Sequence, residues 1–389
     1  MKKLSSGATI VIAYITTCLF WSSIYVYVPI LSTYCESLGT SYTMIGTILS
    51  SYGLVQLIMR IPIGIFSDRI GKKKPFMLFG LSSSVVSGLV FFFGKTPIIM
   101  LLGRTLAGLT ASAWAIFMVN FGSYYPTDKQ SKAMGVIGTT SFIGQVLATL
   151  CGGIIANVFN ERLTFLISSL VGLLGVIMVL VLPEKTTSNS IQPKISDFFE
   201  MLKNKDLLFF SALAIIMQIA VFSGVLGFVP NILKNLGSSN IVLGVATAFS
   251  SLLSIITSLL SGTFFENKVG FKPSIAVSFA IVSLMLVLIG IASNIPMILV
   301  LVLITSAPRG LIQTMLNSLA IRGIKSELRS AAASVFQSIY GLGMTIGPAI
   351  TGIVADRFGV TVAFITIGIF TFTAVVIILF RKTWPVWVK

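Results

Sequence analysis

Histidine is absent from this sequence and acidic residues are scarce. Asp and Glu number 11 among 389 residues, and charged residues of both signs make up 10%. An average soluble domain has about 25% charged residues, so a water-soluble globular protein is excluded. The missing histidine and three scattered cysteines also exclude the ligand spacing of a metal site. No Gly-x4-Gly-Lys-Ser/Thr nucleotide-binding loop is present. We therefore expect no enzyme, no cofactor and no direct use of ATP.

Long apolar runs dominate the composition. Hydrophobic residues make up 55% of the sequence, and the mean hydropathy is +1.00. At about 1.5 Å per residue, each run is long enough to cross a hydrocarbon layer of about 30 Å. Such runs must be helical, because lipid offers the backbone no hydrogen-bond partners. The sequence therefore predicts an all-α integral membrane protein. The twelve expected transmembrane helices are 8–30, 42–66, 75–94, 97–124, 131–157, 163–183, 207–233, 241–264, 273–292, 295–321, 330–355 and 361–381.

The net charge of +16 is distributed unevenly between the two sides of these helices. Of 27 Lys and Arg residues, three fall inside helices, which leaves 24, and 20 of those lie on one side. The four on the other side are Lys95, Arg162, Lys234 and Arg357. Loops rich in Lys and Arg face the cytoplasm. We therefore expect a multi-pass protein of the cell (plasma or inner) membrane with both termini cytoplasmic, and no nucleic-acid partner.

The two halves of the sequence repeat each other. The segment 38–41 (LGTS) recurs at 236–239 (LGSS), and 153–157 (GIIAN) recurs at 352–356 (GIVAD). Because an even number of spans separates the copies, the halves are parallel repeats related by an axis along the membrane normal.

This repeat predicts two domains with a short connection. The expected six-helix bundles are 1–183 and 207–389, and the polar stretch 184–206 is the expected cytoplasmic linker. An amphipathic surface helix is expected within the linker, around 195–202.

The loop between the second and third helices carries a recognisable pattern. It consists of a glycine, an acid, a basic residue, a second glycine and further basic residues, at Gly64, Asp68, Arg69, Gly71, Lys72 and Lys73. This pattern resembles the signature loop of the major facilitator superfamily, and an eroded copy lies at 262–272. The resemblance implies a twelve-helix secondary transporter whose loop latches the inner side shut. Asp68 would then reach the start of the eleventh helix near Ser330, whose N–H groups favour an anion.

Other helices resemble further motifs of this family. Arg104 is followed four residues on by a glycine, and the fifth helix has glycines at the spacing of antiport-type exporters. The fifth helix departs from that pattern, because Ala148-Thr149 replaces the expected Gly-Pro. These residues favour an exporter or simply allow close helix packing. The motif positions are Gly108, Gly144, Gly152 and Gly153, with Gly347 and Pro348 in the repeat.

Three arginines fall inside the expected helices. An ionised side chain at mid-membrane costs about 2.5–3.5 kcal/mol, so such residues usually face a cavity. Arg60 is near enough to the interface to pair there, whereas Arg104 and Arg309 belong to helices that line the central cavity in the resembled fold. All acidic residues fall in loops or at helix ends. Two cations without a nearby carboxylate predict an anionic substrate.

Several polar and aromatic side chains are further candidates for the substrate route. The fourth and eighth residues after Arg309 are Gln313 and Asn317, which form a polar stripe on one helix face. The remaining candidates either line the route or pack between helices. They are Trp21, Tyr25, Gln218 and Gln337.

The sequence thus predicts a secondary active or facilitative transporter that works by alternating access. The expected substrate is a small organic anion, membrane lipids are the expected surroundings, and the expected assembly state is a monomer. An alternative is a proton-coupled exporter of drugs or metabolites, which the fifth-helix glycines favour and the lack of a buried carboxylate opposes. The third interpretation is a membrane sensor or lipid-binding scaffold, and the short loops argue against it.

Overall fold

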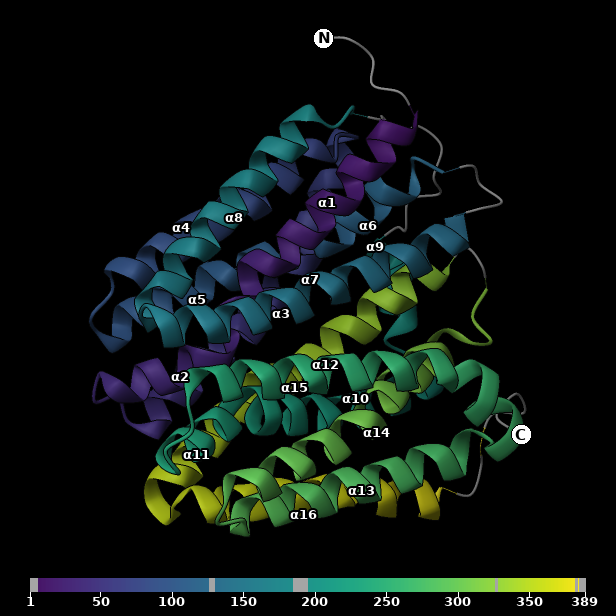
Figure 1. Cartoon of the computed structure of the whole chain (residues 1–389). Helices are drawn as coiled ribbons and strands as arrows, with labels where there is room; N and C mark the ends of the chain where they lie inside the picture. The colour runs from purple at the N-terminus through teal and green to yellow at the C-terminus, as the bar shows by residue number, and fades with distance from the viewer. Residues whose placement is uncertain (1–5, 126–129, 185–194, 326–327, 382–383, 385–389) are drawn as a thin grey trace. The chain divides into compact units, whose positions relative to one another are not determined.

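The computed structural model describes residues 6–125, 130–184, 195–325, 328–381 and 384 (Figure 1). Within these residues, 12 helical segments are long and apolar enough to cross a membrane. This confirms the predicted all-α fold with twelve transmembrane helices. Some spans are divided by a break or by a wider turn, so the helices carry more labels than there are spans.

The elements from the first half of the chain are α1 (Ser6–Tyr25), α2 (Val28–Ser37), α3 (Tyr42–Ile70), α4 (Lys74–Phe93), α5 (Pro97–Ser112), α6 (Trp114–Gly122), α7 (Gln130–Val158), α8 (Glu161–Val181) and α9 (Ile195–Met201). Those from the second half are α10 (Lys205–Ile219), η2 (Ala220–Phe228), α11 (Val229–Asn235), α12 (Asn240–Leu260), η3 (Ser261–Val269), α13 (Phe271–Ile291), α14 (Ile295–Ile321), α15 (Arg329–Phe358) and α16 (Val360–Phe380).

The first span is broken between α1 and α2 and is longer than predicted. Pro29 has no N–H with which to continue the helical hydrogen bonds, so the chain kinks just before it. The span then runs to Ser37 instead of ending at residue 30. Polar residues are tolerated in this last part because they bond within the helix. For example, the Thr33 hydroxyl donates to the Ile30 carbonyl at 2.9 Å.

The backbone repeats the duplication seen in the sequence. Tyr27 precedes Val-Pro with φ −103° and ψ −7°, and Phe228 precedes the second Val-Pro with φ −108° and ψ −10°. Gly71 and Gly270, the second glycines of the two copies of the signature loop, have φ of 70° and 89°. Side chains disfavour this left-handed region, which explains why both copies keep a glycine there.

Two stretches of the second half have π-helical hydrogen bonding. η2 lies within the seventh span between α10 and α11, and η3 extends the eighth span beyond α12. Such wider turns are rare and often occur at functional sites. A wider turn changes the directions of the side chains that follow it. These directions differ from those that a regular α-helix would give for the same sequence.

The chain forms two compact units that exchange short segments between the halves of the sequence. Unit 1 comprises Met1–Leu38, Val55–Ser190 and Ser239–Ala248, and unit 2 comprises Gly39–Leu54, Ile191–Ser238 and Phe249–Lys389. The first half of α3 therefore packs in unit 2, and the first part of α12 packs in unit 1. The boundaries expected from the sequence, with bundles at 1–183 and 207–389, stay a prediction.

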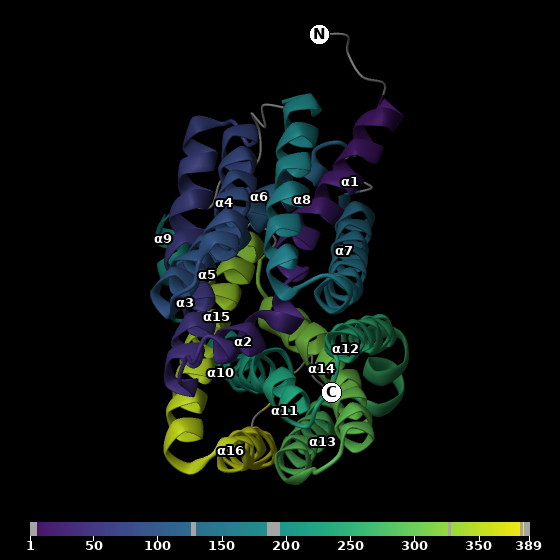
Figure 2. The same ribbon diagram turned by 60° about the vertical axis from the view of Figure 1, so that its left-hand side comes forward.

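In unit 1, α1 lies against α7 and α8, and α4 lies against α5 and α8 (Figure 2). In unit 2, α10 lies along α15, and α13 lies between α14 and α16. The short helix α9 confirms the surface helix expected near 195–202, and it buries Met201 in a cluster with Leu207 and Val335. Residues 185–194 of the predicted linker lie outside the described residues.

Candidate functional site

Arg104 lies inside the helix packing of unit 1. It stands on α5, is 5% exposed, and hydrogen-bonds the Tyr27 hydroxyl. Tyr27 sits at the break between α1 and α2 and packs on Phe91 and Phe165, at ring-centroid distances of 5.0 and 5.7 Å. The guanidinium thus fixes a buried tyrosine at a kink. Sequence reasoning missed Tyr27, although Pro29 two residues later signals the kink.

An aromatic cluster on α1 and α6 contains two predicted site residues. The Trp21 ring lies 5.7 Å from Tyr25 and 5.1 Å from Trp114, in both cases edge to face. The indole N–H of Trp21 is buried and has no hydrogen-bond acceptor within the described part of the chain. Trp114 was not predicted, since nothing in the sequence indicates the helix break at Ala113.

Two of the glutamines predicted for the substrate route meet in unit 2. The Gln218 amide on α10 donates to the Gln313 carbonyl oxygen on α14 at 3.1 Å. Arg309 lies one helical turn before Gln313, is half-buried, and is near the middle of α14. The three side chains therefore share one region of unit 2, and a guanidinium and two amides together offer both donors and acceptors.

Asn317 and Gln337 are the other residues predicted for this region. Asn317 is exposed one turn beyond Gln313, and Gln337 is half-buried on α15. Gly343 on α15 lies so close to α10 that an added Cβ would come within 2.9 Å of the Gln218 Cβ. Gln218 is therefore held between α14 and α15.

A ladder of hydroxyl groups fixes the position of α14 against α12. Ser250 and Ser306 join hydroxyl to hydroxyl at 2.5 Å, and Ser254 donates to the Ser306 carbonyl at 2.7 Å. Thr257 donates to the Ala307 carbonyl at 2.6 Å. These bonds lie beside Pro308, which removes a backbone donor from α14. They hold the segment that carries Arg309, and no pattern in the sequence pointed to them.

In the signature loop, Asp68 forms an ion pair with Lys73. The Lys73 side chain is 5% exposed and that of Asp68 is 36% exposed, so the lysine is the buried partner. Arg69 and Lys72 are exposed, as expected for residues that set topology. The predicted contact of Asp68 with the eleventh helix stays a prediction.

The remaining positions of the loop have separate structural roles. Lys74 donates to the carbonyls of Leu180 and Leu182 at 2.7 and 2.9 Å, which places a cation at the C-terminal end of α8. A Cβ added to Gly64 would meet no atom within 4 Å. In the second copy of the loop, Glu266 pairs with Arg322 at 2.8 Å. Both copies therefore pair their acid with a basic residue.

The predicted glycine motif of α7 lies at close helix contacts within unit 1. An added Cβ at Gly144 would come 2.6 Å from the Cys18 carbonyl oxygen, and one at Gly152 would collide with the Val26 carbonyl. Gly153 faces Gly244 of α12, with 2.8 Å between an added Cβ and the opposite Cα. On α5, Gly108 is buried. These contacts support a packing role, and an exporter role stays a prediction.

The repeat of this motif on α15 makes similar contacts within unit 2. An added Cβ at Gly347 would lie 2.7 Å from the Ser223 hydroxyl of η2. The Pro348 carbonyl meets Gly46 of α3, where a Cβ would collide with it. Backbone therefore touches backbone between α3 and α15.

Polar contacts lie at the first turns of α3 and α12. Asp356, at the end of α15, accepts the N–H groups of Tyr42 and Thr43 of α3 at 2.8 and 2.7 Å. At the corresponding place in the repeat, the Asn240 amide of α12 donates to Glu161 at 3.1 Å and to the Ala156 carbonyl at 3.3 Å. Sequence reasoning missed both contacts, although Asp356 is the last residue of the repeated segment 352–356.

Comparisons with known proteins cover nearly the whole chain. A family model described as Major Facilitator Superfamily matches residues 11–234 and 211–386. An uncharacterised MFS-type transporter of Methanocaldococcus jannaschii is 26% identical over 346 residues, which are 85% of this chain and 87% of that protein. Quinolone resistance protein NorA of Staphylococcus aureus is 26% identical over 187 residues, which are 47% of this chain and 48% of NorA.

Solved structures agree with this family in their fold. A crystallised mutant of the nucleoside transporter NupG has a TM-score of 0.83 at 16% identity, over 97% of this chain and 100% of that one. At this level of identity the likeness concerns the fold alone. The predicted resemblance is confirmed: the chain belongs to the major facilitator superfamily and is a multi-pass membrane transporter.

Proposed function

We propose that this carrier moves a small organic anion and that Arg309 binds it together with Gln313 and Gln218. The supporting observation is the meeting of Gln218 with Gln313 at 3.1 Å, one turn from a half-buried arginine near the middle of α14. A guanidinium binds carboxylate or phosphate through paired hydrogen bonds. The two amides would orient the rest of the substrate.

The charges of the described residues support a negative substrate. Holding Arg309 within the membrane costs about 2.5–3.5 kcal/mol, and an anion offsets this cost. Across the described part of the chain, carboxylates lie at helix ends, in the short helix α9 or in loops. Several are already bound to protein groups, as in the pairs Asp68–Lys73 and Glu266–Arg322.

Arg104 and the aromatic cluster have a different part in this proposal. Arg104 acts as a positioning residue, because its bond to Tyr27 holds the kink between α1 and α2. Trp21 and Tyr25 lie on α1 before this kink, and the indole N–H of Trp21 is buried without an acceptor within the described residues. A change at Arg104 would then alter the angle between α1 and α2 within unit 1.

Alternating access requires contacts that form and break at each side of the membrane. We assign this role on one side to the cap that Asp356 places on α3 and to the Asn240–Glu161 bond. The charge distribution predicts that this side is external, which makes both termini cytoplasmic. A monomer is sufficient for such a cycle.

Flux measurements in proteoliposomes test the substrate charge. We expect Arg309→Gln to lower uptake of a responsive organic anion by about tenfold to a hundredfold, the loss of one charge-assisted bond of about 1.5–3 kcal/mol. Arg309→Lys should restore part of the uptake. Lys95→Gln removes one exposed positive charge in the loop between α4 and α5 and should leave uptake unchanged. Full uptake of the anion by Arg309→Gln would refute the proposal.

A proton-coupled exporter is the second candidate, and the 26% identity to NorA over 187 residues favours it. The two N–H groups that Asp356 accepts favour its ionised form, so this carboxylate would gain a proton only when the α3 cap is released. The likeness to NorA, a quinolone resistance protein, adds drug-like compounds to the substrates that need testing. Flux that depends on an imposed pH gradient, and loses this dependence in Asp356→Asn, would favour this candidate over simple anion exchange.

A further inference from the structure

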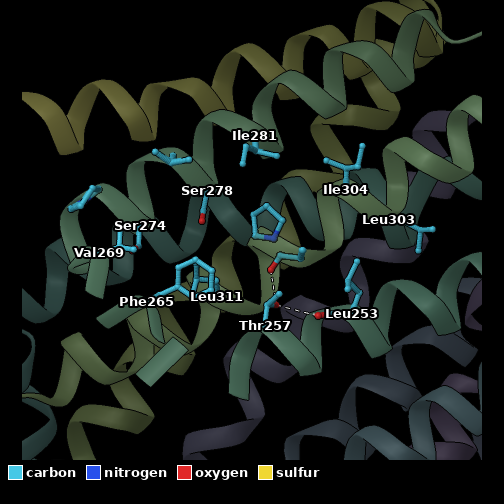
Figure 3. A pocket seen from close by; sticks show the side chains of 14 residues that line it. Leu253, Thr257, Phe265, Val269, Ser274, Ser278, Ile281, Leu303, Ile304 and Leu311 are labelled. Atoms are coloured by element: carbon cyan, nitrogen blue, oxygen red, sulfur yellow. Dashed lines mark hydrogen bonds between the residues drawn. The ribbon is translucent and has the colours of Figure 1, made fainter. Parts of the chain in front are cut away.

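A groove in unit 2 lies beside the segment that carries Arg309: Ala307 and Pro308 line it, whereas the proposed substrate residues do not. It has a volume of about 540 Å³, within the range of about 300–1,000 Å³ that is typical of ligand sites. Its walls come from α12, η3, α13 and α14, and Ile281, Ile304 and Ser278 are arranged around it (Figure 3). Most of the side chains that line it are apolar.

The groove opens onto the surface of the membrane-spanning part. Val277 on its rim is 58% exposed, and Ile304 is 42% exposed. Because these residues belong to transmembrane segments, their exposed surfaces face lipid or a transport route. Along α13 the lining runs from Pro273 to Ile281, which at about 1.5 Å per residue is about 12 Å. This covers most of one leaflet of a hydrocarbon core of about 30 Å.

Two lysines adjoin one end of the groove in the sequence. Val269 and Pro273 line this end, and each is preceded by a lysine, Lys268 and Lys272. The Lys272 ammonium lies 5.9 Å from the Trp384 ring. The Lys268 ammonium lies 5.1 Å from the Phe264 ring, and Lys268 is exposed. The nearby acid, Glu266, is already paired with Arg322. The mouth therefore carries a positive charge at the edge of the membrane, on the side predicted to be cytoplasmic.

A polar group lies just inside this mouth. Ser274 is 4% exposed and lines the groove next to Pro273, and its hydroxyl has no hydrogen-bond partner within the described residues. A buried hydroxyl without a partner costs free energy, so a ligand acceptor at this level would be favourable. In a phospholipid the ester carbonyls lie between the phosphate and the acyl chains, which matches the position of Ser274 between Lys268 and Val277 along the groove.

We propose that the groove binds an anionic phospholipid. One acyl chain lies along Val277 and Ile281, an ester carbonyl accepts a hydrogen bond from Ser274, and the phosphate lies at Lys268 and Lys272. Charge selects the lipid, since each basic residue near an anionic membrane surface contributes about 1 kcal/mol. Burial of the acyl chain in the groove and the bond to Ser274 then hold this lipid in place.

Native mass spectrometry of the full chain, titrated with phosphatidylglycerol or phosphatidylcholine, tests the proposal. We expect phosphatidylglycerol to bind more tightly. The double variant Lys268→Gln/Lys272→Gln should weaken its binding by about thirtyfold, the equivalent of two lysine contributions. The control Lys203→Gln/Lys205→Gln removes the same charge at another exposed pair and should bind as the wild type does.

A second variant tests the groove itself. Ser278→Leu places a larger side chain on a buried wall position and should abolish the tight binding, whereas Val300→Leu on the exposed face of α14 should preserve it. The lysine variant keeps the test valid if Ser278→Leu does not fold. Equal binding of the two lipids would overturn the proposal. So would a Ser278→Leu protein that keeps lipid binding but loses solute flux, because the groove would then hold the transported solute.

Discussion

The Asp356 carboxylate caps the first turn of α3, and its Oδ1 accepts the Tyr42 N–H at 2.8 Å. The Thr43 N–H bonds to the other oxygen at 2.7 Å. An acid at a helix N-terminus gains from both hydrogen bonds and the helix dipole. The residues lie far apart in sequence, so the cap ties the end of α15 to the start of α3.

Loss of this cap should loosen the start of α3. Asp356→Asn keeps the shape but removes the charge and one acceptor, and a cap is worth about 0.5–2 kcal/mol. We expect a cysteine placed at Ser50, in a chain without its native cysteines, to react with maleimide about fivefold faster. Arg357→Gln, which changes the adjacent exposed residue, is the matched control. Equal reaction rates in both variants would show that the cap does not control access.

Two glycines of α3 should respond to alanine in opposite directions. A Cβ at Gly46 would collide with the Pro348 carbonyl, whereas one at Gly64 would meet no atom within 4 Å. Gly46→Ala should therefore destabilise the protein. Gly64→Ala should be neutral or stabilise it by up to about 1 kcal/mol, the difference in helix propensity. Thermal unfolding of the two proteins measures the contrast, and a common shift would contradict the close contact.

Because of the ion pair in the signature loop, replacing Lys73 should cost more stability than replacing the adjacent Lys72. Lys73 is buried and paired with Asp68, whereas Lys72 is exposed. Lys73→Gln should lower stability by about 1–2 kcal/mol, less than the loss of a fully buried pair because Asp68 is partly solvated. Lys72→Gln should change stability by less than about 0.5 kcal/mol. Denaturation in detergent tests this order, which would be wrong if Lys72 were the more sensitive position.

Gln218 and Gln313 should behave as a coupled pair. Because the two amides bond to each other at 3.1 Å, replacing either one with alanine removes the same interaction. We expect a coupling free energy of about 0.5–1.5 kcal/mol in a double-mutant cycle on solute binding or on unfolding. Asn317 is an exposed residue one turn along α14. In a cycle that combines Gln218→Ala with Asn317→Ala, the two free-energy changes should be additive. Additive free-energy changes in both cycles would show that Gln218 does not act together with Gln313 in the site.

The raised pKa of Tyr125 should make the folded protein less stable at alkaline pH. Burial and the bond to Tyr14, at 2.6 Å, raise the pKa of Tyr125 to about 12 from a usual value near 10. Below about pH 10 the phenol is neutral in both folded and unfolded chains, so stability does not depend on it. Between about 10 and 12 only the unfolded chain ionises, and stability declines. Tyr125→Phe should flatten this decline in thermal unfolding curves recorded from pH 9 to 11.

The sequence predicted the spans well because the thickness of a bilayer sets the length of an apolar run. Features that depend on contacts between distant segments were not predictable in this way. Pro29 could have indicated the break before α2, but η2 has no comparable signal. The Asn240 and Asp356 contacts depend on which segments meet, and periodicity does not record that.

The candidate site was predicted by residue type more than by arrangement. Arg309, Gln313 and Gln218 were selected because polar side chains are costly in lipid, and Gln218 does meet Gln313. Arg104 was selected for the same reason, but its bond to the Tyr27 hydroxyl depends on a kink in another helix. Ser306 was passed over because a single serine in a helix usually bonds its own backbone.

The close approach of Gly46 to Pro348, and of Gly153 to Gly244, has a consequence for the energetics of the cell. Where main chain touches main chain there is no room for a file of water molecules. Each elementary charge that leaks across a membrane dissipates about 2.3 kcal/mol per 100 mV of potential. At these two points the helices therefore leave no room for water or ions between α3 and α15, or between α7 and α12, which limits leak while the carrier works.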